Sequence, residues 1–215
     1  MITGFGKQRW AEQEREVDAD KRRLIIEAAR SLFTTRGYET TTMAEVARSA
    51  GVAVGTVYLY FKNKNDLLYG VKDEWDTEFL RFMARPEIQA TPHHLRARPL
   101  IEAVFSLCAQ QTEMVQLMGV QPEMVGHWHT NDGGRVQSAI EAMFNEAQSA
   151  GAFREVDSRA ASVIAYGMVN QALIQCFIIE DGQDQPLYID AVVDAMEQWL
   201  VKPELLKKMR AEQKT

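Results

Sequence analysis

Residues 41–64 constrain this chain most, because they predict two short helices joined by a turn that contains glycine. Thr42 and Glu45 have the spacing of a capping box, in which each side chain satisfies the backbone N–H of the other residue. Gly51 stands where a helix needs a residue of positive φ in order to end. A second helix is predicted over 54–60. Two helices joined in this way form a helix-turn-helix, whose second helix enters the DNA major groove.

The second helix predicts how bases would be read. Its first turn, Val54, Gly55 and Thr56, is small enough for a close approach to the groove floor. The helix contains no Arg, Lys, Asn, Gln, Asp or Glu, the side chains that make bidentate base contacts. We expect Val54 and the Thr56 methyl to touch thymine methyls, and the Thr56 hydroxyl to reach a base or a phosphate. Arg48 is the nearest strong donor to guanine, with surface solvation as its alternative, so direct readout is expected to be modest and supplemented by DNA shape.

Residues in and around this stretch match one known family: Thr41, Thr42, Val46, Ala47, Ala50, Gly51, Val52, Gly55, Thr56, Val57, Tyr58, Tyr60, Phe61, Lys62, Asn63, Lys64, Leu67 and Leu68. Over roughly residues 20–70 the chain resembles the DNA-binding domain of the tetracycline-repressor (TetR) family of bacterial transcriptional regulators. The resemblance implies that Tyr58, Tyr60 and Lys64 hold DNA phosphates, with Thr42 in support.

The net charge of the chain is −6, but its distribution favours a nucleic-acid contact at one end. Residues 21–64 hold eight Lys and Arg against three Asp and Glu, a sum of +5, which leaves −11 for the rest. A positive module on an acidic body concentrates its attractive field where phosphates would dock. Chance fluctuation is the alternative, and the asymmetry alone does not decide between the two.

The composition is that of a soluble globular protein, with 46% hydrophobic and 25% charged residues. No apolar run follows the N-terminal charges, so no signal peptide is expected. The longest apolar stretch, residues 163–179, is interrupted by amide side chains and is predicted not to span a membrane. Cys108 and Cys176 stand inside apolar helical patterns and predict no disulfide framework. A cytoplasmic protein is expected.

The patterns predict an all-α protein in three parts. Residues 1–17 are an N-terminal extension, either a frayed tail or an extra turn or two of helix, with a minor-groove arm as the less favoured alternative. Residues 18–64 are a three-helix DNA-binding domain, whose first helix runs from about residue 20 to 35. Residues 65–215 are a helical body for ligand binding and dimerisation.

The body is predicted to be a series of helices that begins with a long connecting helix capped by Asn63. Three prolines, with His93 and His94 among them, mark a broken connector after it. The predicted segments are a helix over 63–84, a helix over 100–118 with a break near Gln111, a short helix over 122–128, a loop over 127–134, helices over 135–150, 158–180 and 186–201, and a polar tail over 203–211.

The helices over 158–180 and 186–201 are apolar on more than one side, so each needs two partners. One partner is the body itself. The other is predicted to be a second copy of the chain, which makes a four-helix homodimer interface, as the resemblance also implies. Asn170 and Gln171 interrupt the apolar pattern and must find hydrogen-bond partners, either across the dimer or on a ligand.

The aromatic residues and methionines of the body could line a pocket for an apolar ligand, although core packing is the alternative for each of them singly. The resemblance implies a small molecule bound between the long connecting helix and the later helices. The ligand-contacting residues expected on this basis are Trp75, Phe79, Phe82, Phe105, Met118, Trp128, Phe144, Tyr166 and Asn170.

No pattern in the chain indicates catalysis. His127 and His129 do not share a helical face, and no Cys or paired carboxylate stands near them, so they are expected to be loop histidines, like His93 and His94. No nucleophile elbow, phosphate loop or dinucleotide turn is present in the sequence. We therefore expect no metal, no cofactor and no enzymatic activity.

These features predict a ligand-responsive transcriptional regulator: a repressor that binds an inverted-repeat operator as a dimer and is released by a small, mainly apolar effector. The alternative is a DNA-binding scaffold of the same fold that acts through protein partners without a ligand. A small-molecule binder or enzyme with a vestigial helix-turn-helix is a third interpretation, against which the charge of residues 21–64 argues.

Overall fold

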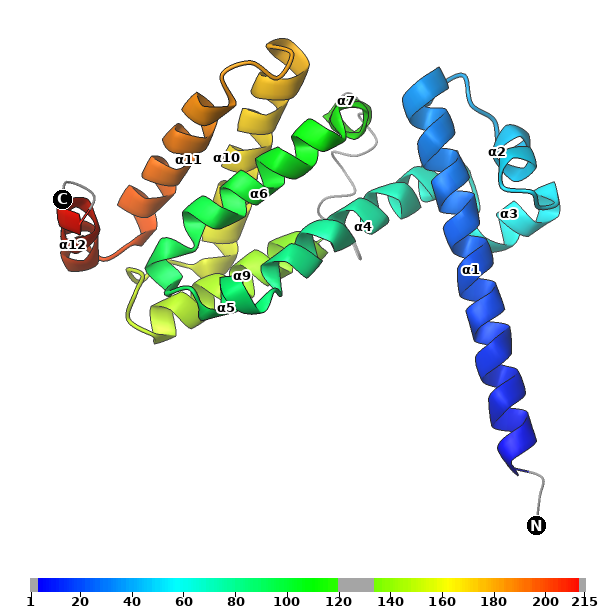
Figure 1. Cartoon of the computed structure of the whole chain (residues 1–215), viewed down its shortest axis with the longest axis horizontal. Helices are drawn as coiled ribbons and strands as arrows, with labels where there is room; N and C mark the ends of the chain where they lie inside the picture. Colours follow the sequence, from blue (N-terminus) through cyan, green and yellow to red (C-terminus); the bar gives the residue numbers. More distant parts are fainter. Residues whose placement is uncertain (1–3, 120–133, 213–215) are drawn as a thin grey trace. The chain divides into compact units, whose positions relative to one another are not determined.

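The computed structural model describes residues 4–119 and 134–212, and within these ranges it is helical with no β-strand (Figure 1). The predicted all-α fold class is therefore confirmed. The chain divides into two compact units, Met1–Lys72 and Asp73–Thr215, and the division falls within α4 (Lys64–Met83). The predicted boundary stood at the start of α4, whereas the first turns of this helix pack into the first unit.

The first unit holds α1 (Gly4–Arg36), α2 (Met43–Ser49), α3 (Val54–Tyr60) and the beginning of α4. The predicted bounds of α3 and the predicted start of α4 are confirmed. The predicted start of the first helix near residue 20 is wrong, because the helix already begins at Gly4. Residues 5–20 contain no proline and are rich in strong helix formers, so nothing in that stretch ends the helix.

The core of the first unit is built by apolar side chains from all four of its helices, and α2 and α3 lie beside the C-terminal part of α1 (Figure 1). Its most deeply buried members are Ile25, Ala29, Phe33, Val46, Ala47, Val57, Leu67, Leu68 and Val71. Val57 is the buried residue of α3, so that helix is held by one face and leaves the other exposed.

The second unit is a bundle of helices in which α6 packs on α11 and α10 packs on α9. Its elements are α5 (Pro86–Ala90), η1 (His93–Leu95), α6 (Ala97–Gln110), α7 (Thr112–Gly119), α9 (Arg135–Ser149), α10 (Ser158–Ile174), the π-helical segment η2 (Gln175–Ile179), α11 (Gln185–Leu200) and α12 (Pro203–Glu212). The break between α6 and α7 at Gln111 confirms the predicted interruption. The helix predicted over 122–128 lies outside the described residues, as does the loop predicted over 127–134 except for its last residue, Gly134.

The residues predicted to form a polar tail are instead a helix, α12. Met209 is buried, and Leu205 and Leu206 pack against the core of the second unit. These three side chains form an apolar stripe on one face of the helix. The prediction of a tail rests on the overall polar composition of the segment, which does not show this stripe. Just before α12, Phe153 and Val201 form an isolated antiparallel bridge that ties the segment after α9 to the end of α11.

Candidate nucleic-acid interface and ligand cavity

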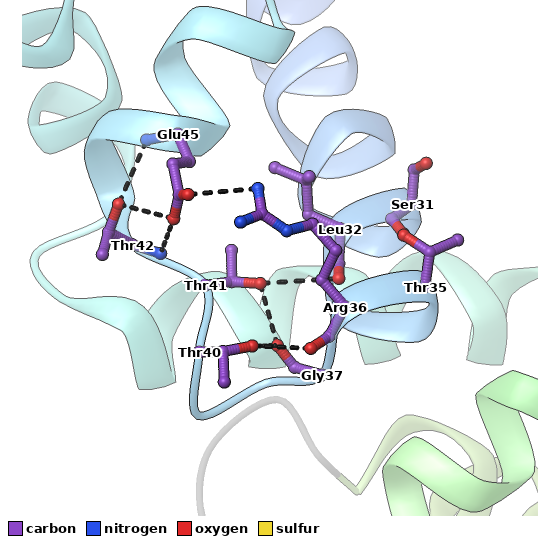
Figure 2. Close-up of polar contacts among 9 residues, drawn as sticks. All are labelled: Ser31, Leu32, Thr35, Arg36, Gly37, Thr40, Thr41, Thr42 and Glu45. Carbon is purple, nitrogen blue, oxygen red and sulfur yellow. Dashed lines mark hydrogen bonds and ion pairs between the residues drawn. The ribbon is translucent and has the colours of Figure 1, made fainter.

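The connection between α1 and α2 is fixed by threonine side chains (Figure 2). Gly37 ends α1 with a φ of +93°. Thr40 Oγ1 donates to the carbonyl of Arg36 at 2.6 Å, and Thr41 Oγ1 donates to the carbonyl of Gly37 at 2.8 Å. These bonds satisfy carbonyls that the end of α1 leaves without helical partners. The start of α2 is therefore held at one position relative to α1.

The predicted capping box at the start of α2 is confirmed (Figure 2). The backbone N–H of Thr42 donates to Glu45 Oε2 at 2.9 Å, and the backbone N–H of Glu45 donates to Thr42 Oγ1 at 3.3 Å. Arg36 Nη1 lies 3.1 Å from Glu45 Oε1. The hydrogen bonds from Thr42 lower the pKa of Glu45, and the charge of Arg36 adds to this effect. Thr42, predicted to support phosphate binding, thus holds α2 in place with its hydroxyl.

The turn between α2 and α3 has the geometry that a helix-turn-helix requires. Ala50 caps α2, and the next residue, Gly51, adopts a φ of +69°, as its position predicted. The backbone N–H of Val52 returns to the carbonyl of Ala47 at 3.0 Å. The backbone N–H of Thr56 then bonds the carbonyl of Ala53 at 2.9 Å and begins α3. The backbone of this turn is therefore fixed by local hydrogen bonds.

One face of α3 is exposed and almost wholly apolar. Val54 is 42% exposed, Tyr58 51% and Leu59 84%. Gly55 is exposed on the same face, and a Cβ atom there would meet no atom within 4 Å. Sequence reasoning missed Leu59, although its spacing of four residues from Gly55 places both on one helical face.

Two of the predicted phosphate-binding side chains bond within the first unit. The hydroxyl of Tyr60 donates to the carboxylate of Asp18, and this bond raises the pKa of Tyr60. Lys64 Nζ donates to the carbonyls of Tyr38 at 3.0 Å and Glu39 at 3.1 Å. Arg48 is exposed, and within the described residues no hydrogen bond or ion pair engages its side chain. The phosphate and base roles of these residues remain predictions.

The first unit carries the positive charge. Residues 1–72 hold 12 Lys and Arg against 9 Asp and Glu, whereas residues 73–215 hold 12 against 21. The net charge is therefore +3 on the first unit and −9 on the second. A surface of this sign attracts phosphates over distances of the order of the Debye length.

A cavity of about 130 Å³ lies within the second unit and is lined mainly by apolar side chains. This volume is similar to the roughly 150 Å³ of a cavity that binds benzene. The residues that line it between the start of α4 and the end of α6 are Trp75, Asp76, Phe79, Met83, His93, His94, Arg96, Ala97, Leu100, Ile101, Val104 and Leu107. Those that line it from α9 onwards are Val136, Ile140, Met143, Phe144, Phe153, Ala165, Tyr166, Val169, Asn170, Leu173, Met196, Glu197, Leu200 and Val201.

Five of the side chains predicted to bind a ligand lie along this cavity: Trp75, Phe79, Phe144, Tyr166 and Asn170. Three others lie elsewhere. Phe105 packs in the core at a ring-centre distance of 5.9 Å from Phe177, Phe82 lies under the guanidinium of Arg85, and Met118 is buried outside the cavity. Trp128 lies outside the described residues. Ligand binding by any of them remains a prediction.

The cavity also has polar groups in its wall. Trp75 Nε1 and His93 Nδ1 are buried and have no hydrogen-bond partner within the described residues. Burial lowers the pKa of His93 and raises the pKa of Tyr166, to which the charge of Asp76 adds. Burial also raises the pKa of Glu197. An apolar space lined by a few polar residues is typical of a small-molecule site.

The described residues hold no cluster of three or more His, Cys, Asp or Glu side chains that could bind a metal ion. His127 and His129 lie outside the described residues. Cys108 and Cys176 are free and buried. Burial raises the pKa of Cys108 to about 12, which keeps it as an unreactive thiol.

α10, η2 and α11 carry large apolar side chains that the second unit leaves exposed. Val163 is 42% exposed, Ile164 52%, Ile179 62% and Leu187 63%. Within the described residues, Ser158–Ile179 is long and apolar enough to cross a membrane, but a core helix passes the same test. This segment packs against α9, α11, α7 and α6, so it forms part of the bundle.

Comparison with known proteins assigns the first unit to a family. The family "Bacterial regulatory proteins, tetR family" matches residues 25–70. The HTH-type transcriptional regulator HbdR of Aromatoleum sp. (strain CIB) is 36% identical over 42% of this chain, but the match spans only 38% of HbdR. The HTH-type transcriptional regulator AcrR of Shigella flexneri is 24% identical over 74% of this chain and 80% of its own length.

The fold of the whole chain also has solved counterparts. The transcriptional regulator FadR from Bacillus subtilis, solved in complex with stearoyl-CoA, aligns with a TM-score of 0.66 at 22% identity. The alignment covers 81% of this chain and 96% of FadR. At this identity the likeness shows the fold alone. The sequence match and the capped helix-turn-helix within it place residues 25–70 in the tetR family of bacterial regulatory proteins.

Proposed function

We propose that this regulator is a homodimeric repressor that binds an inverted-repeat operator through α2 and α3 and is released by a small, mainly apolar effector. The observation that carries the proposal is the exposed face of α3 on a cationic unit, with α2 fixed beside it by the Thr42–Glu45 capping box. A rigidly held helix with a free face is what insertion into a major groove requires.

The exposed faces of α10 and α11 support the proposed homodimer. Large apolar side chains in water are unfavourable, and a second copy of the same two helices would cover them in a four-helix interface. A two-fold axis between the copies would present two copies of α3, about 34 Å or a longer whole-turn spacing apart on the duplex. The operator would then be an inverted repeat, because its symmetry matches that of the dimer.

The cavity supports the proposed effector. Its lining is mainly apolar, with Tyr166 and Asn170 among the few polar residues, so the effector would be a small, mainly apolar molecule. The complex of FadR with stearoyl-CoA adds support, because it shows a protein of this fold with a ligand that carries a long apolar acyl chain. A scaffold that senses no ligand would not need such a space, so the cavity also argues against that alternative.

The proposed mechanism couples the two units through α4. Trp75, Asp76, Phe79 and Met83 of α4 line the cavity, and the N-terminal turns of the same helix belong to the DNA-binding unit. An effector that binds better to one position of α4 would favour a dimer state whose two copies of α3 no longer match the operator spacing. Couplings of this kind are typically worth about 1 to 3 kcal/mol.

Selection of random duplex DNA by the purified full-length protein, at stated salt, tests the proposal. We expect enrichment of an inverted repeat, whose half-site spacing reports the dimer geometry. Retention without an enriched sequence would favour the scaffold that binds phosphates alone. No retention at low salt would refute the DNA-binding role, provided that denaturation and refolding of the protein, which strips any bound effector, gives the same result.

A further inference from the structure

Leu59 is the most exposed large apolar side chain among the described residues, at 84%. It lies near the C-terminal end of the exposed face of α3, next to Tyr58 and one turn after Gly55. The core of the first unit does not use it, because Val57 and Phe61 supply the buried side of this segment. The fold therefore gives no reason for a leucine at this position.

A single exposed leucine is ordinary on a protein surface, but this one belongs to a group. Val54 and Tyr58 share its helical face and are about half exposed. The same seven-residue helix has no charged or amide side chain. This helix is proposed to enter the major groove. Its apolar face would be buried most favourably against an apolar group on the DNA.

The major groove offers one such group on its base edges, the 5-methyl of thymine. The missing side chain at Gly55 leaves open space beside Leu59, since a Cβ atom there would meet nothing within 4 Å. The backbone of α3 can therefore come close enough for Leu59 to reach the groove floor. Lys62 and Arg48 are exposed at the ends of α3 and α2 and carry the charge that phosphates on either side would attract.

We propose that Leu59 is a base-reading residue that selects thymine by packing against its 5-methyl group. The inference rests on the proposed function, because it assigns a base preference to the same helix. It gives the helix a means of direct readout that needs no bidentate hydrogen bond. Because 5-methyl contacts are local, the preference falls on individual base pairs in each half-site.

The test removes the methyl group from the DNA and the leucine from the protein. Duplexes retained by the full-length protein from a random pool are resynthesised with deoxyuridine in place of one half-site thymidine at a time. We expect at least one such position to weaken binding of the wild-type protein by about fourfold, the value of one buried methyl-sized group. For Leu59→Ala we expect the thymine and uracil duplexes at that position to bind equally. Because Leu59 is exposed, this substitution leaves the core intact.

Two matched variants serve as controls. Leu24→Ala removes another exposed leucine of the first unit and should keep the full preference for thymine. Val54→Ala tests the other aliphatic side chain on the exposed face of α3. Loss of the preference in Val54→Ala but not in Leu59→Ala would overturn the assignment, and so would equal binding of uracil and thymine duplexes by the wild-type protein. If no duplex binds at all, the proposed function itself fails, which is a different result from sequence-specific binding without methyl dependence.

Discussion

The ammonium group of Lys64 lies 4.3 Å from the centre of the Tyr38 ring and donates a 3.0 Å hydrogen bond to the carbonyl of the same residue. Lys64 is the first residue of α4, and Tyr38 follows the end of α1. The exposed carboxylate of Glu39, 4.0 Å from Nζ, adds little in solvent. A side chain expected to clamp DNA therefore also ties α4 to the connection between α1 and α2.

Replacing Lys64 by alanine is expected to have two separable effects. Loss of the charged donor and of its contact with the Tyr38 ring should destabilise the first unit by about 1 to 2 kcal/mol, measured by urea unfolding. If Lys64 also reaches a phosphate, the plot of log affinity against log salt should flatten by about one unit on all duplexes. Lys62→Ala is the control, because Lys62 is exposed and its loss should leave stability unchanged. An unchanged salt slope in Lys64→Ala would restrict this residue to its structural role.

Gly70 on α4 is expected to resist substitution although it stands inside a helix. A Cβ atom at this position would lie 2.7 Å from Phe61 Cε1 and 3.2 Å from Phe61 Cζ. The Phe61 ring is buried with the guanidinium of Arg22 above it, so it cannot move aside freely. The strain, typically about 1 to 3 kcal/mol, should outweigh the roughly 1 kcal/mol that alanine gains in helix propensity. Gly70→Ala should therefore lower the unfolding midpoint, whereas Gly55→Ala, with open space around it, should raise it.

The boundaries of α2, α3 and α4 could be read from the sequence because each depends on chemistry within a few residues. Thr42 and Glu45 cap α2, Gly51 supplies the positive φ after it, and Asn63 accepts a 2.8 Å hydrogen bond from the Asp66 amide at the start of α4. Signals of this kind need no knowledge of the tertiary structure.

The cavity could not be predicted in the same way. Phe105 and Phe144 are equally buried aromatic residues on amphipathic helices, yet only Phe144 borders the cavity. Which side chain fills the core and which faces a gap depends on how α4, α6, α9, α10 and α11 pack together. Composition indicates that the interior is apolar, but it does not show where a cavity remains between the side chains.

Acid should destabilise the first unit through Glu45. Its pKa lies below the ordinary value of 4.5, because hydrogen bonds from Thr42 and the charge of Arg36 favour the carboxylate. A lowered pKa means that the stabilisation is fully present above pH 4.5 and is lost as the pH falls through the folded-state value. Glu45→Gln keeps a side chain that can complete the capping box and removes the titration. Unfolding of the variant should depend less on pH below 4.5 than unfolding of the wild type, and identical profiles would contradict the assignment.

Filling the cavity should abolish effector binding and spare DNA binding. Val169 of α10 lines the cavity, and Val169→Phe would place a ring in the space that an effector is proposed to use. Benzene, which matches the cavity in size, serves as the probe: it should raise the unfolding midpoint of the wild type and raise that of the variant much less. Leu95→Phe is the control, because Leu95 is 39% exposed and lies outside the cavity lining. Equal probe binding by the wild type and Val169→Phe would show that the probe binds elsewhere.

A charge on the exposed face of α10 should separate the proposed dimer. Ile164 is 52% exposed on α10, and Leu187, 63% exposed, lies on α11. Ile164→Glu would bury an unpaired carboxylate in a four-helix interface, which is costly, but leaves it in water if the chain is a monomer. Sedimentation equilibrium should therefore give the mass of two chains for the wild type and of one for the variant.

Measuring the affinity of the same variant for operator DNA then links the oligomeric state to function. A single chain can occupy one half-site only, so Ile164→Glu should lose most of its affinity for an inverted repeat and bind an isolated half-site as the wild type does. Leu95→Glu, a charge at another exposed leucine of the second unit, should remain a dimer with full operator affinity. A variant Ile164→Glu that sediments as two chains would place the dimer interface on another surface, because an apolar seam at α10 and α11 cannot accept that carboxylate without a partner.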